Sequence, residues 1–230
     1  MNYPLSLENI TVAIQDGDHE RNILENINLH VEKGQCIGVS GESGSGKSTL
    51  LAVAGTLTTP TSGTVTISGH NTTDMNAAQR AKMRREHCSF IFQSPQLHNS
   101  LTAREQLVSV YYLDRLLPLT GKKKKQVENR ADELLELVGL ADRGKAYPKQ
   151  LSGGQRSRVG VARALMTHPE VLLVDEPTAA LDSQRAQEVT ELIVQATHEY
   201  DIATLFVSHS QDQLDQLDNI IYMKDGILTQ

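Results

Sequence analysis

The stretch Gly41-Glu42-Ser43-Gly44-Ser45-Gly46-Lys47-Ser48-Thr49 decides the fold of this chain. It follows the apolar run 36–40, which is typical of a buried strand, and precedes the run 50–54, which is typical of a helix interior. Glycines let such a loop curl so that successive backbone N–H groups face one triphosphate, and the helix N-terminus adds the positive end of its dipole. Lys47 can reach the β- and γ-phosphates, and Ser48 can hold Mg²⁺. The spacing therefore predicts a nucleotide-binding loop.

Length and composition limit the other possibilities. The chain has 230 residues, 22% of them charged, and a net charge of −6, which disfavours sequence-independent binding to nucleic acid. Its two cysteines, Cys36 and Cys88, lack metal-ligand spacing, so we expect buried free thiols. No basic-then-apolar leader and no run of about 18 apolar residues occurs, so we expect neither secretion nor a membrane span but a cytoplasmic protein.

Apolar periodicity predicts an α/β fold. Helical patterns separate several of the strand signals, and the strand signals stop between about Ser94 and Gln150. There the pattern predicts helices over 102–116 and 122–138, which we interpret as an inserted helical subdomain. The predicted strands are Leu5–Ile10, Ile27–Val31, Cys36–Ser40, Val65–Ile67, Ser89–Phe92, Val171–Val174, Thr204–Val207 and Ile220–Met223.

Two adjacent carboxylates end one of these strands. The apolar run 171–174 leads directly into Asp175 and Glu176, and burying charges at such a place needs a reason. A nucleotide-bound Mg²⁺ supplies one. Asp175 can hold the ion through water, and Glu176, which strand alternation would aim the other way, can orient or deprotonate the attacking water.

A second glycine-rich helix start is present at Leu151-Ser152-Gly153-Gly154-Gln155. Ser152 can cap the helix that follows over 156–166, and the exposed N–H groups there can bind an anion. A structural cap alone would need one glycine at most. The sequence thus carries two phosphate-binding motifs for one nucleotide.

In these motifs the chain resembles the ATP-binding-cassette ATPases over nearly its full length. The first loop resembles their Walker A, the run 171–176 their Walker B with its catalytic glutamate, and the run 151–155 their signature. The resemblance implies a P-loop fold with a mainly parallel core sheet, an N-terminal antiparallel β part and an inserted helical subdomain. It implies one domain over 1–230, with the core at 1–93 and 168–230 and the helical subdomain at about 94–167.

The resemblance also implies activity and partners. In that family two cassettes pair head to tail, and each signature closes over the γ-phosphate bound by the other, so we expect an ATPase that uses ATP and Mg²⁺ and pairs with a second copy of itself. Gln93 resembles the glutamine that touches Mg²⁺ and the attacking water, Asp182 belongs to a run that resembles the loop across the dimer interface, and His209 is similar to the histidine that contacts the γ-phosphate. The implied nucleotide contacts are Gly41 to Thr49, Ser152 to Gln155 and Asp182.

One position departs from the family pattern. The family usually places an aromatic on the early strands, where it stacks on adenine, but no Phe, Tyr or Trp occurs between Tyr3 and Phe90. The equivalent position is Ile14 or Val12. Because base–aromatic stacking is worth roughly 1 to 3 kcal/mol in nucleic-acid proteins, preference for adenine over guanine is open.

A single cassette without a long heptad arm indicates a transporter subunit. Its permease would be a separate membrane protein, in two copies, and would hold the cassette at the cytoplasmic face of the membrane. Phe92-Gln93, the run 101–105 and Gly139-Leu140 resemble the group that powers lipoprotein release and macrolide export. The run 177–182 resembles the haem-exporter and heterocyst-glycolipid exporter ATPases. The resemblance thus suggests an exporter, with haem as the suspected substrate. A cell-division-type ATPase that regulates a membrane partner without transport is the alternative.

One charge run belongs to none of these motifs. Lys122 to Lys125 stand together at the start of a predicted helix. A solvated helix face is one interpretation, and contact with lipid headgroups or with an acidic partner is the other.

Overall fold

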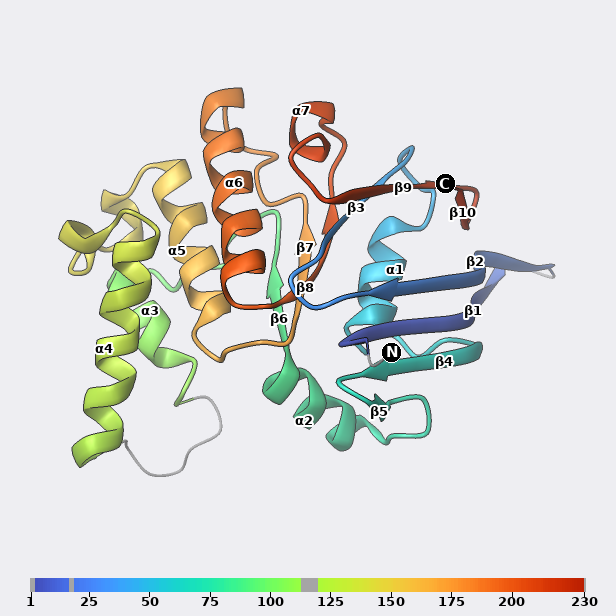
Figure 1. The fold of residues 1–230 in the computed structure, drawn as a ribbon, viewed down its shortest axis with the longest axis horizontal. Coiled ribbons are helices and arrows are strands. Elements are labelled where there is room, and N and C mark those ends of the chain that lie inside the picture. The colour runs from blue at the N-terminus through green and yellow to red at the C-terminus, as the bar shows by residue number, and fades with distance from the viewer. Residues whose placement is uncertain (1–2, 17–18, 113–119, 230) are drawn as a thin grey trace. The chain divides into compact units, whose positions relative to one another are not determined.

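The computed structural model describes residues 3–16, 19–112 and 120–229, in two compact units. The first unit comprises Met1–Phe90, Pro169–Glu176 and Val194–Gln230, and the second comprises Ile91–His168 and Pro177–Ile193. The predicted helical insertion at 94–167 falls within the second unit, which also takes in the start of a long helix after Pro177. Figure 1 shows the course of the chain through both units.

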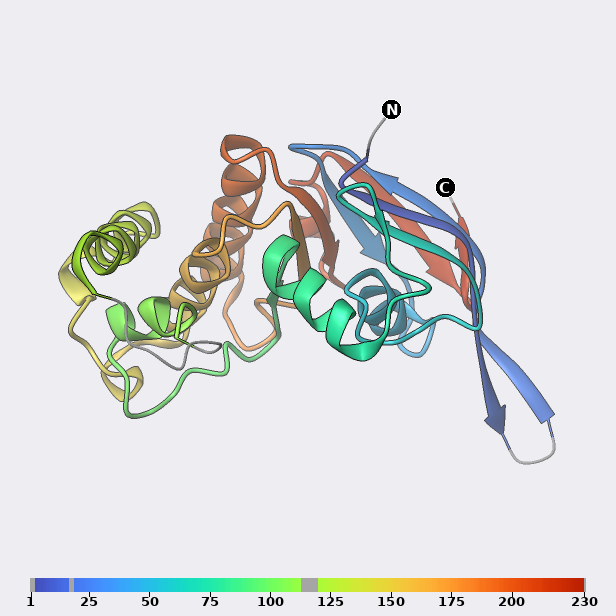
Figure 2. The same cartoon turned by 90° about the horizontal axis from the view of Figure 1, so that it is seen from below.

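An antiparallel sheet forms one layer of the first unit. Its strand order is β2-β1-β4-β5, and β1 and β2 form the long hairpin seen in Figure 2. Alternate residues of β1, such as Leu5 and Leu7, are fully buried, as expected of a sheet with one face on the core. The strands are β1 (Leu5–Asp16), β2 (His19–Val31), β4 (Ser62–Ile67) and β5 (His70–Asn71).

A mainly parallel sheet forms the second layer. Its order is β10-β9-β3-β8-β7-β6; β3 pairs in parallel with β8 and β9, β7 pairs in parallel with β8, and β10 is antiparallel to β9. The side chains of β8 are buried along its whole length, which fits a strand covered on both faces. The strands are β3 (Cys36–Ser40), β6 (Cys88–Ile91), β7 (Val171–Asp175), β8 (Ala203–Val207), β9 (Asn219–Lys224) and β10 (Ile227–Thr229).

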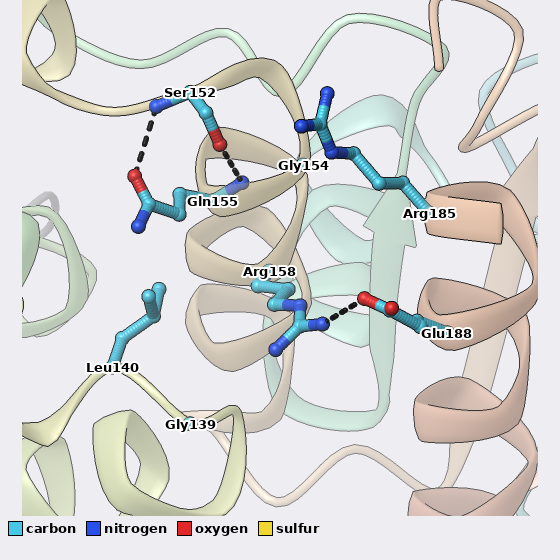
Figure 3. Close-up of a pocket in the computed structure, with 8 residues that line it drawn as sticks. All are labelled: Gly139, Leu140, Ser152, Gly154, Gln155, Arg158, Arg185 and Glu188. Carbon is cyan, nitrogen blue, oxygen red and sulfur yellow. Dashed lines mark hydrogen bonds and ion pairs between the residues drawn. The ribbon is translucent and has the colours of Figure 1, made fainter. Parts of the chain in front are cut away.

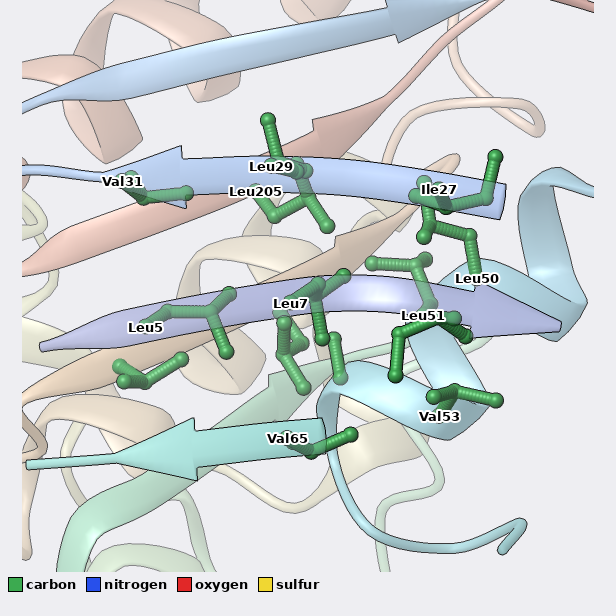
Figure 4. Packing of buried hydrophobic residues seen from close by; sticks show 14 of the residues in the cluster. Leu5, Leu7, Ile27, Leu29, Val31, Leu50, Leu51, Val53, Val65 and Leu205 are labelled. Atoms are coloured by element: carbon green, nitrogen blue, oxygen red, sulfur yellow. The ribbon is translucent and has the colours of Figure 1, made fainter. Parts of the chain in front are cut away.

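The core of the first unit joins these two sheets. Helix α1 (Lys47–Ala54) contacts β2, β7 and β8, and its Leu50 and Val53 are fully buried with side chains from both sheets (Figure 4). Cys36 and Cys88 are buried free thiols, as predicted. Burial raises the pKa of the Cys88 thiol to about 12, so it is held neutral and unreactive. Because α1 directly follows the loop 41–46, its packing anchors the C-terminal end of that loop in the core.

Three helices, α3 to α5, pack together in the second unit. They are α3 (Ala103–Ser109), α4 (Gly121–Leu137) and α5 (Gly153–Leu165), with single 3₁₀ turns at Ala141–Arg143 and Pro148–Gln150. Helix α3 is shorter than the predicted helix over 102–116, of which residues 113–116 lie outside the described residues.

The remaining helices were not predicted from the sequence. They are α2 (Ala77–His87), α6 (Ser183–Glu199) and α7 (Gln211–Leu214). Among the described residues, no helix is both long and apolar enough to cross a bilayer.

Candidate functional site

The loop between β3 and α1 requires its glycines. Gly41, Gly44 and Gly46 have φ of 145°, 82° and 108°, a region that side chains with a Cβ rarely adopt. A Cβ at Gly41 would lie 2.1 Å from the carbonyl oxygen of Met223, and one at Gly46 would lie 2.8 Å from that of Ile23. The backbone of this loop is therefore held tightly by neighbouring strands, whereas Gly44 has open space around it.

The buried side chain of Lys47 hydrogen-bonds back to the start of the loop. Only 6% of this residue is exposed, and its ammonium donates hydrogen bonds of 2.7 Å to the carbonyl oxygens of Gly41 and Glu42. Burial lowers the pKa of Lys47, while the carboxylates of Glu176 and Asp175 act in the opposite direction. The hydroxyl of Ser45 is buried and, among the described residues, lacks a hydrogen-bond partner. A buried hydroxyl of this kind is satisfied by a ligand that accepts or donates there.

The other loop residues are more open. Glu42, Ser43, Gly44 and Ser48 are exposed, and Thr49 is half-buried. The loop therefore presents solvent-accessible backbone around a buried lysine and a buried hydroxyl, which is the arrangement that a polyphosphate needs.

Asp175, the last residue of β7, is half-buried beside Glu176 and Lys47. Burial raises the pKa of Asp175, the neighbouring charge of Glu176 raises it further, and Lys47 opposes both. Two carboxylates facing one ammonium leave a net negative charge. The donor set thus fits a hard divalent cation such as Mg²⁺, which prefers carboxylate and hydroxyl oxygens.

Glu176 lies just beyond the strand, in a left-handed conformation with φ of 45°. Its N–H donates to the carbonyl oxygen of Val207 on β8 at 3.1 Å, and its Oε1 lies 2.7 Å from Nε2 of His209. The expectation that strand alternation aims Glu176 was wrong, because the strand ends at Asp175 and the turn sets the direction of the side chain. Non-glycine residues in this region of φ and ψ cost free energy and cluster at functional sites.

His209 follows β8 on a loop that its neighbours hold in place. The buried Ser208 hydroxyl donates to Gln213 at 2.8 Å and accepts from the N–H of Ser210 at 3.0 Å. The side chain of His209 is 49% exposed, so it remains open to a ligand. The first unit thus brings Lys47, Asp175, Glu176 and His209 together from three segments of the chain.

The two positions considered for the base contact differ in exposure. Val12 is 6% exposed and packs in the core, whereas Ile14 is 46% exposed. Ile14 is therefore the one that can meet a ligand. Its cross-strand partner on β2 is the exposed Arg21, which sequence reasoning did not select.

In the second unit, Ser152 caps α5. Its hydroxyl accepts the N–H of Gln155 at 3.3 Å, and the side chain of Gln155 accepts the N–H of Ser152 at 2.9 Å. Because the hydroxyl accepts here, its proton stays available to an external acceptor. The predicted helix start at Arg156 lies one turn too late, since α5 begins at Gly153.

The two glycines of this motif are not required by their own chain. Neither Gly153 nor Gly154 has a positive φ, and the nearest atoms to an added Cβ would be side-chain atoms of Leu181 and Arg185, both at 3.3 Å. Glycine costs a helix about 0.5 to 1 kcal/mol relative to alanine. Packing within the described structure therefore does not explain why glycine occupies positions 153 and 154, and a binding partner would explain it.

A pocket of about 180 Å³ opens beside Gly154, as Figure 3 shows. Arg158 on α5 pairs with Glu188 on α6 across the pocket, and its Nη1 donates to the carbonyl oxygen of Val138 at 3.4 Å. Sequence reasoning missed Arg158 and Glu188. Helical spacing from Gly154 could have placed Arg158 on the same face of α5, because residues four apart lie on one side of a helix. The pocket is lined by Gly139, Leu140, Ser152, Gly154, Gln155, Arg158, Arg185 and Glu188.

The remaining predicted site residues also lie in the second unit. Gln93 is exposed just beyond β6. Asp182 accepts the N–H of Arg185 and pairs with its guanidinium, both at 3.1 Å. Each unit thus carries one part of the predicted site, and the roles of these residues stay predictions.

Comparison with known proteins agrees with this geometry. Residues 24–179 match the protein family described as "ABC transporter". The chain is 38% identical over 226 residues to the lipoprotein-releasing system ATP-binding protein LolD of Shewanella denitrificans, covering 98% of this chain and 94% of LolD. It is 38% identical over 222 residues to HrtA of Staphylococcus haemolyticus, which is named for hemin import, covering 96% and 97%.

Longer relatives and solved structures match as well. The chain is 41% identical over 218 residues to the macrolide export ATP-binding/permease protein MacB of a Shewanella species, but it spans only 32% of the length of MacB. The ATP-binding cassette MJ0796, solved as a dimer in a post-hydrolysis state bound to ADP and phosphate, superposes with a TM-score of 0.84 at 33% identity, covering 98% of this chain and 97% of that one. By its fold, its loop and these relatives, the chain belongs to the ABC transporter family and is one of its ATP-binding, ATP-hydrolysing cassettes.

Proposed function

We propose that this chain powers a transporter by closing onto a second copy of itself around ATP, with the motif 151–155 of each copy completing the nucleotide site of the other. The observation that carries the proposal is the pair Gly153 and Gly154, which begin α5 without a positive φ that would require glycine. The Ser152 hydroxyl, which still has a proton to donate, suits a γ-phosphate there. A solved cassette of the same fold is a dimer.

Within each site the residues divide the work. The loop from Gly41 to Thr49 holds the triphosphate, with Lys47 as the cation that turns from the loop carbonyls to the phosphates. Glu176 orients or deprotonates the attacking water, and His209, which lies 2.7 Å from it, steadies that carboxylate and reaches the γ-phosphate. Ile14 packs on the base.

Asp175, Ser48 and Gln93 would hold Mg²⁺. When bound, the ion neutralises charge on the phosphate oxygens. The net negative charge around Asp175 supports this assignment, since its pKa is raised by burial and by the charge of Glu176. Asp182 lies in the segment that would meet the second copy.

Mixing two defective chains tests the pairing. Lys47→Ala damages the loop and Ser152→Arg damages the second motif, so a mixed dimer contains one composite site that is wholly intact and one that is doubly damaged. ATP-dependent dimerisation should return in the mixture above the level of either variant alone, as measured by size-exclusion chromatography with Mg-ATP. If each site drew all its groups from one chain, the mixture would recover nothing, and the proposal would be wrong.

Glu176→Gln tests the chemistry separately. General-base assistance is typically worth 10² to 10⁴ in rate, so turnover should fall on the order of 10² or more while ATP binding is kept. A variant with near-normal hydrolysis would remove Glu176 from this role.

We further propose that a separate permease, in two copies, holds the cassette at the cytoplasmic face of a membrane. The proposed direction of transport is export, and haem is the substrate to test first. The names of the relatives differ, since MacB is named for macrolide export, LolD for lipoprotein release and HrtA for hemin import. The permease that copurifies with the chain decides between them. Haem should raise the ATPase rate of that complex and not of the chain alone. A response only to macrolide or lipoprotein would overturn the haem assignment. A partner that controls wall hydrolases would indicate regulation without transport.

A further inference from the structure

Helix α4 (Gly121–Leu137) carries its charges in the reverse of the favourable order. Lys122, Lys123 and Lys124 lie in its first turn, and Lys125 begins the second. The first turn contains no acidic residue, and the last turn contains no basic one. A helix has a positive N-terminal end and a negative C-terminal end, so cations are unfavourable in the first turn. These lysines therefore weaken the helix that carries them.

Two other helices follow the favourable order at one end. Helix α3 has Glu105 in its first turn, within a capping box, and α2 ends with Arg84, Arg85 and His87 in its last turn. Basic residues do occur in the first turn of other helices, but among the described helices only α4 carries more than one there.

The lysines also lack compensation from nearby carboxylates. Lys124 lies 3.9 Å from Glu128, but within the described parts of the chain no carboxylate lies within 4.0 Å of Lys122, Lys123 or Lys125. The residue before the helix, Thr120, makes no side-chain capping bond. The four side chains are exposed, so the start of the helix presents four positive charges on a chain whose net charge is −6, and only that of Lys124 has a carboxylate within 4.0 Å among the described residues.

The rest of α4 keeps this turn in place. Val127, Ala131, Leu134 and Leu135 are buried against the neighbouring helices, and Asp132 pairs with Arg104 of α3 at 2.6 Å. Packing of the later turns therefore supports an unfavourable first turn. Residues that weaken a structure are typical of sites kept for binding.

We propose that the Lys122–Lys125 cluster binds the surface of a bilayer that contains anionic phospholipids. All four residues are lysines, which act as compact point charges on flexible stems, rather than arginines, which form the paired hydrogen bonds that recognise a defined carboxylate or phosphate. The pocket beside Ser152 includes none of them. Mobile charges without a groove suit a fluid surface of many phosphates better than they suit a folded acidic peptide.

The contact would act beside the permease and would not replace it. Each lysine near an anionic surface strengthens binding about fivefold, which corresponds to about 1 kcal/mol, and the effect falls off within a Debye length of roughly 10 Å at 0.1 M salt. Four lysines together are worth up to about 10³-fold. The inference does not depend on the proposed pairing, because it concerns the isolated chain without nucleotide.

The test is vesicle co-sedimentation of the full chain at low salt, with phosphatidylcholine alone or mixed with phosphatidylglycerol. The unmodified chain should bind only the mixed vesicles, and salt should release it. Changing all four lysines of the cluster to Gln should abolish binding, whereas changing them to Arg should keep it. A matched control changes Lys33, Lys82, Lys145 and Lys149 to Gln, which alters the net charge equally at exposed positions, and it should retain most of the binding.

A thermal melt accompanies each variant. The Gln variant of the cluster should melt no lower than the unmodified chain, since it removes charges that oppose the helix dipole, and this excludes unfolding as the cause of lost binding. Equal binding to both kinds of vesicle, or equal loss in the control variant, would overturn the proposal. Binding to soluble poly-glutamate without binding to mixed vesicles would assign the cluster to an acidic protein partner and would also overturn it.

Discussion

Gly154→Ala should stabilise the isolated chain and at the same time prevent ATP-driven pairing. The added Cβ would meet Cδ of Arg185 at 3.3 Å, and that exposed side chain can move aside at little cost. Gly154 stands in the first turn of α5 without a positive φ, so alanine suits the backbone. Within the described structure, the shift of the Arg185 side chain is thus the cost that we expect the gain in helix propensity to exceed.

The magnitude follows from helix propensity. Replacing glycine by alanine in a helix is worth about 0.5 to 1 kcal/mol, which for a chain of this size raises the melting temperature by about 1 to 4 °C. If a phosphate of the second copy must approach this backbone, the new methyl group blocks it. We expect ATP-dependent dimerisation to weaken at least tenfold, the equivalent of about 1.4 kcal/mol.

Two assays read these effects independently. Calorimetry without nucleotide measures the melting temperature, and sedimentation with Mg-ATP, in the Glu176→Gln background that slows hydrolysis, measures pairing. Gly144→Ala is the matched control: Gly144 has helical angles of −54° and −28°, and its Cβ would meet Leu135 at 3.4 Å, but it lies outside the signature. It should leave pairing unchanged. Normal pairing by Gly154→Ala, or a melting temperature several degrees lower, would refute the reasoning.

Three further predictions concern the rest of the site. Asp175→Asn should raise the stability of the nucleotide-free chain on the order of 1 kcal/mol at pH 7 and should abolish its stabilisation by Mg-ATP. Because the pKa of Asp175 is raised in the folded state, the unmodified chain loses stability as the pH rises through that pKa and the carboxyl ionises. The stability advantage of the Asn variant should therefore be gone below about pH 4, as measured by calorimetry. An advantage that persists there would contradict the assignment. Arg158→Ala should lower kcat with little change in the ATP concentration needed for half-saturation. Arg158 holds α5 to Glu188 and to the carbonyl of Val138, and all three residues lie outside the loop that binds ATP. An unchanged kcat would mean that the ion pair of Arg158 with Glu188 is only structural. Ile14→Tyr should tighten ATP binding by up to about tenfold, the low end of a stacking gain, and titrations with ATP and GTP that show strong ATP preference in the unmodified chain, unaltered by the substitution, would mean that another residue such as Arg21 reads the base.

Local chemistry made much of the site predictable. The glycine loop, the strand ending in Asp175 and the capped glycine pair each carry their function in adjacent residues, so their presence can be read from the sequence. Helix α2 was missed because its apolar residues are sparse in the sequence, and only Met83 of them is buried. Helix α6 carries a helical spacing of buried apolar residues, at Ala186, Val189, Ile193 and Ala196, which sequence reasoning overlooked.

The predicted direction of Glu176 failed for a related reason. Strand alternation applies only inside a strand, and β7 ends at Asp175, whereas Glu176 is left-handed and its N–H donates to Val207 on β8. The partner in that bond lies about thirty residues further along the chain. A contact of this range follows from the sheet order and not from the run of apolar residues.

The sequence by itself determined the kind of protein, because a loop of glycines before a lysine has one physical use and its residues are contiguous. Only the tertiary structure decided which groups meet. It placed His209 within 2.7 Å of Glu176, left the Ser45 hydroxyl buried without a partner among the described residues, and showed that Gly153 and Gly154 are not needed by their own chain. These facts depend on the distances between segments far apart in the chain, and such distances are set by how the sheets and helices pack.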